Sequence, residues 1–218
     1  IVKTLYDISN RENIEFKNLW LPSIPKDIYL ANIINKYKFS SNPYQIECII
    51  GEYDDPANQF QDIFKVNLNN GHVYIFGNTG SGKENMLMSM IYSACIYHTS
   101  EEVNFYILDF GAETLKVYKN MPHVGDVITV DEKNKVNSLF VMIERQINIR
   151  KELFSEFGGN YDSYIKNSGK TLPLIVIALN NYESFLENYN TQNEYFIHQM
   201  RDCAKYGIIY ILTSVAVN

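Results

Sequence analysis

Short apolar runs alternate along this chain with longer stretches in which apolar residues recur at helical spacing. The runs are typical of buried strands, and they are Val73–Phe76, Phe105–Leu108, Val124–Val130, Leu174–Leu179 and Ile208–Thr213. The periodic stretches predict helices at Met86–Cys95, Val136–Phe154 and Tyr195–Tyr206. Strands that are apolar throughout are buried on both faces, so this order predicts an α/β domain with a mainly parallel sheet flanked by helices on both faces.

The first part of the chain lacks this alternation. The stretch Leu19–Pro25 contains two prolines, which exclude a regular helix, and Trp20 is expected to anchor it against a core. We therefore predict that residues 1–45 form a proline-containing N-terminal arm packed on the core domain. The core domain is expected to span residues 46–218, and its sheet is expected to need further strands beyond residue 218.

The core is predicted to begin with a strand at Cys48–Tyr53. The sequence Asp54-Asp55-Pro56 follows it and is typical of a turn. The next apolar run, Val73–Phe76, leads directly into the most informative motif of the chain.

That motif is a glycine-rich loop of the pattern G-x-x-x-x-G-K, placed between a buried strand and an amphipathic helix. It consists of Gly77, Asn78, Thr79, Gly80, Ser81, Gly82 and Lys83. The glycines let the backbone curl so that N–H groups point inward, and the following helix directs its partial positive end to the same place. Lys83 is expected to reach the β- and γ-phosphates of a nucleotide. The loop therefore predicts a P-loop, with ATP as the expected ligand.

The position after the lysine departs from this pattern. A serine or threonine there normally gives a hydroxyl to Mg²⁺, and this chain has Glu84. The carboxylate could bind a hard cation, repel a triphosphate, turn back onto Lys83 and the loop N–H groups, or point to solvent. We expect it to impair binding of the Mg²⁺–nucleotide complex.

A second departure follows the strand Leu174–Leu179. ATPases of this type carry acidic residues at this strand end, whereas this chain has Asn180 and Asn181. An amide cannot act as a general base. Asp109 and Glu183 remain possible substitutes, although Asp109 is also a candidate helix-capping or turn residue. We assign no catalytic residue and no metal ligand.

The charge of the chain bears on its binding partners, and its cysteines bear on its redox chemistry. The formal net charge is −6 and the chain has no lysine or arginine cluster, which does not favour nucleic acid as a partner. The three cysteines, Cys48, Cys95 and Cys203, lie far apart in apolar surroundings and predict buried reduced thiols. No apolar run approaches the ~20 residues that cross a bilayer.

Taken together, the motifs of this chain resemble the FtsK/SpoIIIE-type P-loop ATPases, and most closely the C-terminal ATPase domains of the EssC group in type VII secretion. The resemblance spans nearly the whole chain and includes segments outside the P-loop, among them Trp20–Pro25, Gly51–Pro56, Tyr106–Gly111, Met121–Gly125, Arg150–Phe154 and Pro173–Tyr182. It implies a RecA-like core. The Asn-Asn-Tyr ending looks most like the last, degenerate domain of that group.

The resemblance also implies a setting for the domain. It suggests a module of a larger membrane-anchored protein on the cytoplasmic side of a bacterial membrane, with neighbouring ATPase domains, a possible hexamer and small helical-hairpin secreted substrates of the WXG class. ATP binding would be weak, and Mg²⁺ binding is left open. A degenerate domain for substrate recognition or regulation is the favoured hypothesis. The alternatives are an active export motor and a DNA translocase.

Two further residue roles come from the same resemblance. Active relatives complete the site with an arginine from a neighbouring subunit, and Arg150 lies in the matching helix. We favour for Arg150 the plainer interpretation of a surface arginine paired with a carboxylate. A polar sensor for the γ-phosphate is expected at the end of the last strand, at Thr213 or Ser214.

Overall fold

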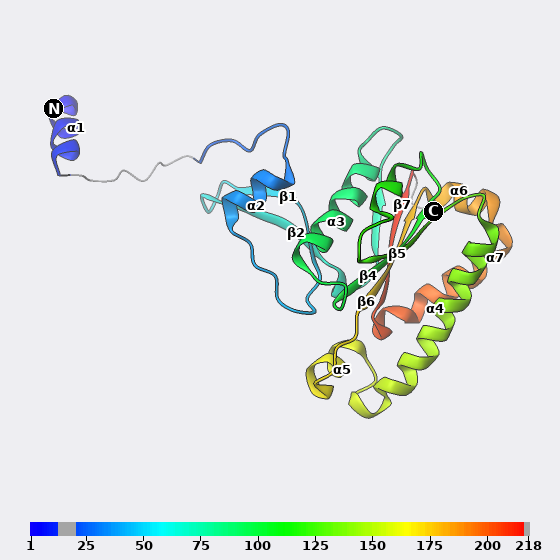
Figure 1. The fold of residues 1–218 in the computed structure, drawn as a ribbon. Helices are drawn as coiled ribbons and strands as arrows, with labels where there is room; N and C mark the ends of the chain where they lie inside the picture. The colour runs from blue at the N-terminus through cyan, green and yellow to red at the C-terminus, as the bar shows by residue number, and fades with distance from the viewer. Residues whose placement is uncertain (13–20, 216–218) are drawn as a thin grey trace.

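The computed structural model describes residues 1–12 and 21–215, and its centre is a five-stranded parallel sheet (Figure 1). The strands occur in the order β3-β7-β6-β4-β5, and every neighbouring pair is parallel. Their bounds are β3 Val73–Phe76, β4 Val103–Asp109, β5 Val124–Thr129, β6 Leu174–Asn180 and β7 Ile208–Ser214. The predicted parallel sheet is confirmed.

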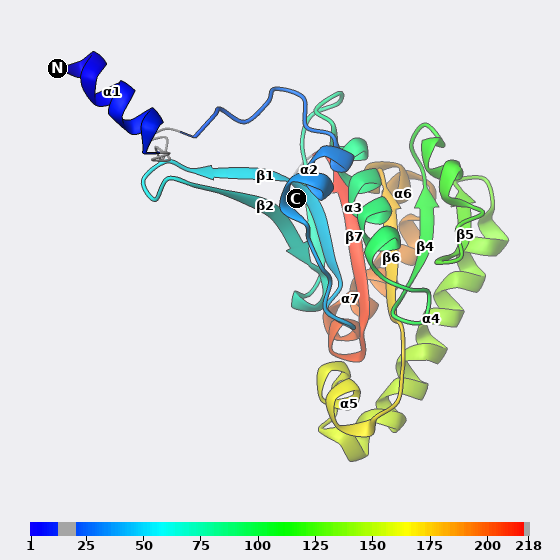
Figure 2. The same ribbon diagram turned by 60° about the vertical axis from the view of Figure 1, so that its left-hand side comes forward.

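Five helices follow or connect these strands, and they lie on both sides of the sheet (Figure 2). Their bounds are α3 Lys83–Tyr97, α4 Lys133–Phe154, α5 Tyr161–Ser168, α6 Tyr182–Asn188 and α7 Asn190–Cys203. The sequence pattern predicted α3, α4 and α7. It missed α5 and α6, which have eight and seven residues and are too short to show a clear helical period.

Strand β6 shows why both faces of the sheet are covered. All seven of its residues are buried, and successive side chains enter different cores. Val176 and Ala178 pack in the core that contains α3, whereas Ile177 and Leu179 pack in the core that contains α4 and α7. Alternate side chains of β6 therefore enter one apolar core or the other. Because both faces of the strand are buried, its sequence is apolar without interruption.

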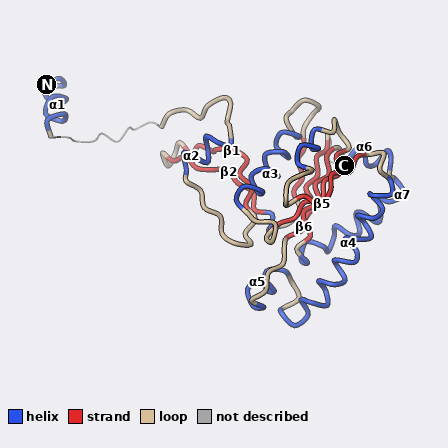
Figure 3. The backbone as a smooth tube through the Cα atoms, in the orientation of Figure 1, coloured by secondary structure: helices blue, strands red, loops and turns tan. Residues whose placement is uncertain are grey.

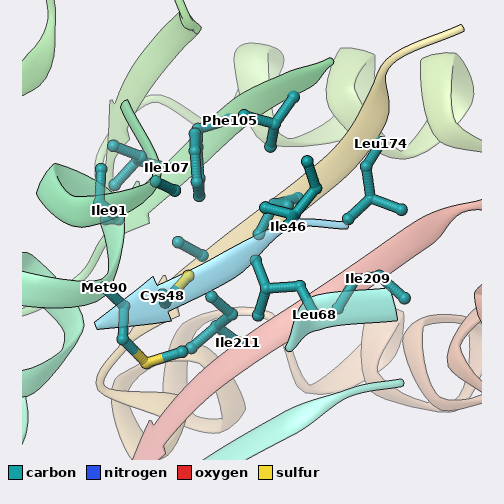
Figure 4. Packing of buried hydrophobic residues seen from close by; sticks show 14 of the residues in the cluster. Ile46, Cys48, Leu68, Met90, Ile91, Phe105, Ile107, Leu174, Ile209 and Ile211 are labelled. Carbon is teal, nitrogen blue, oxygen red and sulfur yellow. The ribbon is translucent and has the colours of Figure 1, made fainter. Parts of the chain in front are cut away.

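A two-stranded antiparallel hairpin packs on the α3 side, formed by β1 Glu47–Asp55 and β2 Phe60–Asn67. Figure 4 shows Ile46 and Cys48 inserted among buried side chains of α3 and of the sheet, including Met90, Ile91, Phe105, Ile107 and Ile211. The amide of Ile49 donates to Ser93 Oγ at 2.7 Å. β1 was predicted and β2 was not, and the turn that joins them lies at residues 56–59, just after the expected position.

The described part of the first 45 residues, 1–12 and 21–45, contains two helices, α1 Val2–Arg11 and α2 Leu30–Tyr37 (Figure 3). Ile33 of α2 is 1% exposed and packs with Ile49 and Ile63 of the hairpin. Residues 21–25 form no helix, as the prolines predicted, but α2 was not foreseen. The expected anchoring role of Trp20 lies outside the described residues.

No helix within residues 1–12 and 21–215 is both long enough and apolar enough to span a membrane. The feature of the fold that matters for function is the edge at which the carboxyl ends of the parallel strands meet. In open α/β sheets, ligands bind in the crevice outside this edge. The glycine-rich loop follows β3 there, and Asp109 and Asn180 end β4 and β6.

Candidate nucleotide site

A pocket of about 380 Å³ opens at the carboxyl edge of the sheet. Its lining combines the glycine-rich loop with the ends of β6 and β7, and it includes Asn78–Asn85, Gly111, Asn180, Asn181, Glu183, Thr213 and Val215. The structure therefore brings most of the predicted site residues into one cavity. Asp109 does not line it, although its neighbour Gly111 does.

The loop has the backbone conformation that its glycines allow. Gly80 and Gly82 adopt φ values of 77° and 90°, in the left-handed region that other residues rarely enter. Gly77 differs, because a Cβ there would lie 2.3 Å from Ser81 Oγ and would force that side chain to move. The Gly77 amide donates to the carbonyl of Ser214 at 3.2 Å, which ties the start of the loop to the end of β7.

Lys83 begins helix α3 and folds back over its own loop. Its Nζ donates to the carbonyl of Gly77 at 2.6 Å. The lysine, the loop N–H groups and the amino end of α3 together form a cationic and hydrogen-bond-donating wall. Such a wall would fit the phosphates of a nucleotide, and Lys83 could then exchange its bond to Gly77 for one to a phosphate oxygen.

Among the described residues, the Glu84 side chain bonds neither to Lys83 nor to the loop N–H groups, which was one of the expected arrangements. Its Oε1 accepts a hydrogen bond from the hydroxyl of Thr114, in the 3-10 helix Thr114–Tyr118. The carboxylate is half-buried and still lines the pocket. Glu84 thus connects the first turn of α3 to the segment that follows β4, and no sequence signal pointed to Thr114 as its partner.

Asn180 lies in a buried polar network across three strand ends. Its Nδ2 donates to Asp109 Oδ1 at 3.2 Å, and its Oδ1 accepts from the hydroxyl of Thr213 at 2.9 Å. Asp109 is 1% exposed, and its Oδ2 accepts the amide of Leu115 at 2.9 Å. Asp109 therefore holds the turn that leaves β4, which is the structural role considered for it beside the catalytic one.

Asn181 also has its side chain engaged by the protein. It adopts a left-handed conformation with φ 70° and caps α6, its Oδ1 accepting the Ser184 amide at 3.3 Å. Its Nδ2 donates to the carbonyl of Phe110 at 3.1 Å, and its own amide donates to Thr213 Oγ1 at 2.8 Å. The amides at the end of β6 are thus part of the packing between strand ends and loops.

Glu183 and the end of β7 meet on the opposite wall of the pocket. Oε1 of Glu183 accepts the hydroxyl of Ser214 and the amide of Val215, each at 2.6 Å. Thr213, the other candidate sensor, is 1% exposed and already donates to Asn180. Both hydroxyls at this strand end are therefore hydrogen bonded to the protein.

The site suits the phosphates of a nucleotide better than it suits the Mg²⁺ ion that accompanies them. The loop conformation and Lys83 fit a phosphate chain. The groups expected beside Mg²⁺ are Glu84, Asn180 and Asn181, and each has a hydrogen bond within the protein. Within residues 1–12 and 21–215, no group of three His, Cys, Asp or Glu side chains could hold a metal ion.

Arg150 is placed differently from either expectation. It is 1% exposed, so it is neither a surface residue paired with a carboxylate nor available to a neighbouring subunit. Its guanidinium donates to the backbone carbonyls of Tyr206, Gly207 and Pro173 at 2.9, 3.0 and 2.7 Å. These partners come from segments distant in sequence from the helix that carries Arg150.

Residues 29–202 match the sequence model of the FtsK/SpoIIIE family. Among curated proteins, the chain is similar to the type VII secretion system protein EssC of Staphylococcus aureus (strain MRSA252). The identity is 28% over 200 residues, covering 87% of this chain and 14% of that protein. The chain thus spans about 14% of the length of this relative.

Two solved structures are similar in fold. EssC (ATPases 2 and 3) from Geobacillus thermodenitrificans gives a TM-score of 0.77 at 26% identity, covering 90% of this chain and 37% of that one. Thermomonospora curvata EccC (ATPases 2 and 3) in complex with a signal sequence peptide gives 0.73 at 23% identity, covering 90% of this chain and 36% of that one. The second likeness shows the fold alone.

Proposed function

The chain belongs to the FtsK/SpoIIIE family, and from that membership we propose that it is a nucleotide-binding domain with weak or absent ATP hydrolysis, part of an EssC-type secretion protein. The main support for the proposal is the chemistry of the two residues at the carboxyl end of β6. Asn180 and Asn181 are amides, and their side chains are bonded to Asp109, Thr213, Phe110 and Ser184. An amide cannot remove a proton from an attacking water.

The remaining carboxylates near the pocket have other tasks. Asp109 accepts the Leu115 amide and the Asn180 amide, and Glu183 accepts two donors from the end of β7. Both carboxylates are thus held in structural contacts, and Asp109 does not line the pocket. This supports a site that retains phosphate binding and has lost efficient hydrolysis.

We assign the work of the domain to recognition or regulation. The Thermomonospora relative was solved with a signal sequence peptide, and the Staphylococcus relative is a secretion protein. By analogy, the partners of this domain are neighbouring ATPase domains and small helical-hairpin secreted proteins of the WXG class, in an assembly that could be hexameric. The domain would then act on the cytoplasmic side of a bacterial membrane.

The division of the chain belongs to the same proposal. Residues 46–218 would form the P-loop domain and residues 1–45 an arm that packs on it. The burial of Ile33 against Ile49 and Ile63 supports the packing of the second half of that arm.

The direct test is a titration of the purified domain with ATP, with and without Mg²⁺, together with a measurement of phosphate release. We expect weak binding and turnover near that of a Lys83→Ala control. Robust Mg²⁺-dependent hydrolysis that Lys83→Ala abolishes would refute the proposal.

The second candidate is an active export motor, and the presence of Glu183 in the pocket lining favours it. If it holds, Lys83→Ala in the full-length protein abolishes export, whereas unchanged secretion excludes it. A DNA translocase is a third possibility, and absence of DNA retardation at low salt would remove it.

A further inference from the structure

Two residues that depart from the magnesium-ATPase pattern contact the same short segment of the chain. This segment, residues 109–115, leads from the end of β4 into the 3-10 helix Thr114–Tyr118. Glu84 accepts the hydroxyl of Thr114, and Asn181 donates to the carbonyl of Phe110 at 3.1 Å. Both contacts come from elements distant in sequence, so the segment is held from α3 and from β6 at once.

The third departure, Asn180, holds the same segment in two ways. Its backbone carbonyl accepts the amide of Phe110 at 3.2 Å, and its side chain donates to Asp109. The segment also passes close over the amide, because a Cβ at Gly111 would lie 2.6 Å from Asn180 Nδ2. Glu84, Asn180 and Asn181 therefore all line the pocket, and all three also form hydrogen bonds that hold residues 109–115 in place.

The chemistry of the neighbours fixes how the Asn180 amide is oriented. A carboxylate such as Asp109 only accepts hydrogen bonds, so it must face the NH₂ group. With the NH₂ group facing Asp109, the carbonyl oxygen of Asn180 faces Thr213, whose hydroxyl accepts the Asn181 amide and donates its own proton to that oxygen. Only an amide of this length donates on one side and accepts on the other. An aspartate at this position would place two buried carboxylates side by side.

We propose that Asn180 is a positioning residue whose amide holds the Asp109 carboxylate, and through it the 109–115 segment, against the ends of β6 and β7. Asp109 in turn fixes the far end of the segment, because it accepts the Leu115 amide at 2.9 Å. The inference goes beyond the proposed function, because this task needs no nucleotide. Charged groups near the pair include Lys83, Glu84 and Glu183 in the pocket lining, Glu113 in the segment and Lys116 directly after it.

The geometry makes an exchange of the two side chains the decisive experiment. Asp109→Asn and Asn180→Asp are made singly and together, and thermal unfolding is measured without nucleotide. Asn180→Asp sets carboxylate against carboxylate, and Asp109→Asn sets one NH₂ group against another donor. Each single change is expected to lower Tm by about 5 °C or more. The exchanged variant again sets one NH₂ group against one carboxylate, and oxygens still face the Leu115 amide and the Thr213 hydroxyl. Its Tm is therefore expected to return most of the way to that of the original protein.

A local measurement accompanies the unfolding. Amide hydrogen exchange at residues 110–115 is expected to speed up in Asn180→Asp and to slow again in the exchanged variant. The matched control is Asn181→Asp, which loses a donor to a carbonyl at the same strand end. Because Asn181 bonds to Phe110, Ser184 and Thr213, adding Asp109→Asn to Asn181→Asp is expected to give no recovery.

Additive effects of Asp109→Asn and Asn180→Asp would overturn the proposal. So would failure of the exchanged variant to fold while Asn181→Asp folds, since the exchange would then have rescued nothing. These outcomes are independent of ATP turnover, so the inference and the proposed function can fail separately.

Discussion

The guanidinium of Arg150 donates a hydrogen bond to the backbone carbonyl of Gly207 at 3.0 Å, inside the protein. It is 1% exposed, and burial lowers its pKa to about 10. The same side chain also bonds the carbonyls of Tyr206 and Pro173. Arg150 thereby joins the last turns of α4 to the turn before β7 and to the entry of β6.

Replacing Arg150 by Met is expected to destabilise the fold by about 3 kcal/mol, because three carbonyls lose a charged donor in a buried place. Chemical denaturation measures this value directly. The matched control is Arg145→Met on the exposed side of the same helix, with an expected change within about 0.5 kcal/mol. Equal effects of the two substitutions would contradict the role assigned to Arg150.

Two histidines, the half-buried His72 and the buried His98, predict a stability that falls in mild acid. Nδ1 of His72 accepts the Tyr210 amide at 3.0 Å, so Nε2 carries the proton and donates to the Met200 carbonyl at 2.7 Å. Burial lowers the pKa of both His72 and His98. Their folded-state pKa values lie below the unfolded value of about 6.5, so the unfolded chain takes up protons first. Stability is full above that pH and is lost as the pH falls below it.

The measurement is Tm as a function of pH between neutral and mildly acid conditions. His72→Gln removes one of the two titrations and is expected to make the decline shallower. The exposed His198 provides the control, since His198→Gln should leave the slope unchanged. Parallel curves for the original protein and His72→Gln would show that His72 does not contribute.

Glu84 is expected to weaken nucleotide binding by its charge. It lines the pocket that the phosphates would enter, although its carboxylate accepts the Thr114 hydroxyl. Glu84→Gln removes the charge and keeps the shape, and we expect ATP affinity to rise by about 1–3 kcal/mol. Glu84→Thr should give a gain of similar size. Calorimetric titration decides, and an unchanged affinity for both variants would mean that the charge is too well solvated to matter.

The three cysteines are expected to be unreactive in the folded protein. All are buried, and burial raises the pKa of Cys95 and of Cys203 to about 12 and that of Cys48 further. The reactive thiolate is therefore scarce at neutral pH. A thiol reagent should label all three only after denaturation. Fast labelling of the native protein would show that one of these regions opens readily.

The parts of the fold with a local signal could be predicted from the amino-acid sequence. The strands β3, β4, β6 and β7 have continuous apolar runs, and the P-loop is identified by its pattern and its flanking elements. The hairpin strand β2 and the helix α2 were missed, because their burial patterns depend on each other and on α3. Both interpretations of Arg150 were wrong, since its partners are carbonyl groups that no side-chain pattern reveals.

The sequence by itself determined the α/β class, the P-loop and the substitution of Glu84, Asn180 and Asn181 for the expected residues. These follow from periodicity and spacing, which are properties of adjacent residues. Only the tertiary structure decided what the substituted residues do. Asp109 and Asn180 are 71 positions apart in the chain, and their side chains meet because β4 and β6 are neighbours that end at the same edge of the sheet. A hydrogen bond depends on distance and direction, and strand pairing sets both.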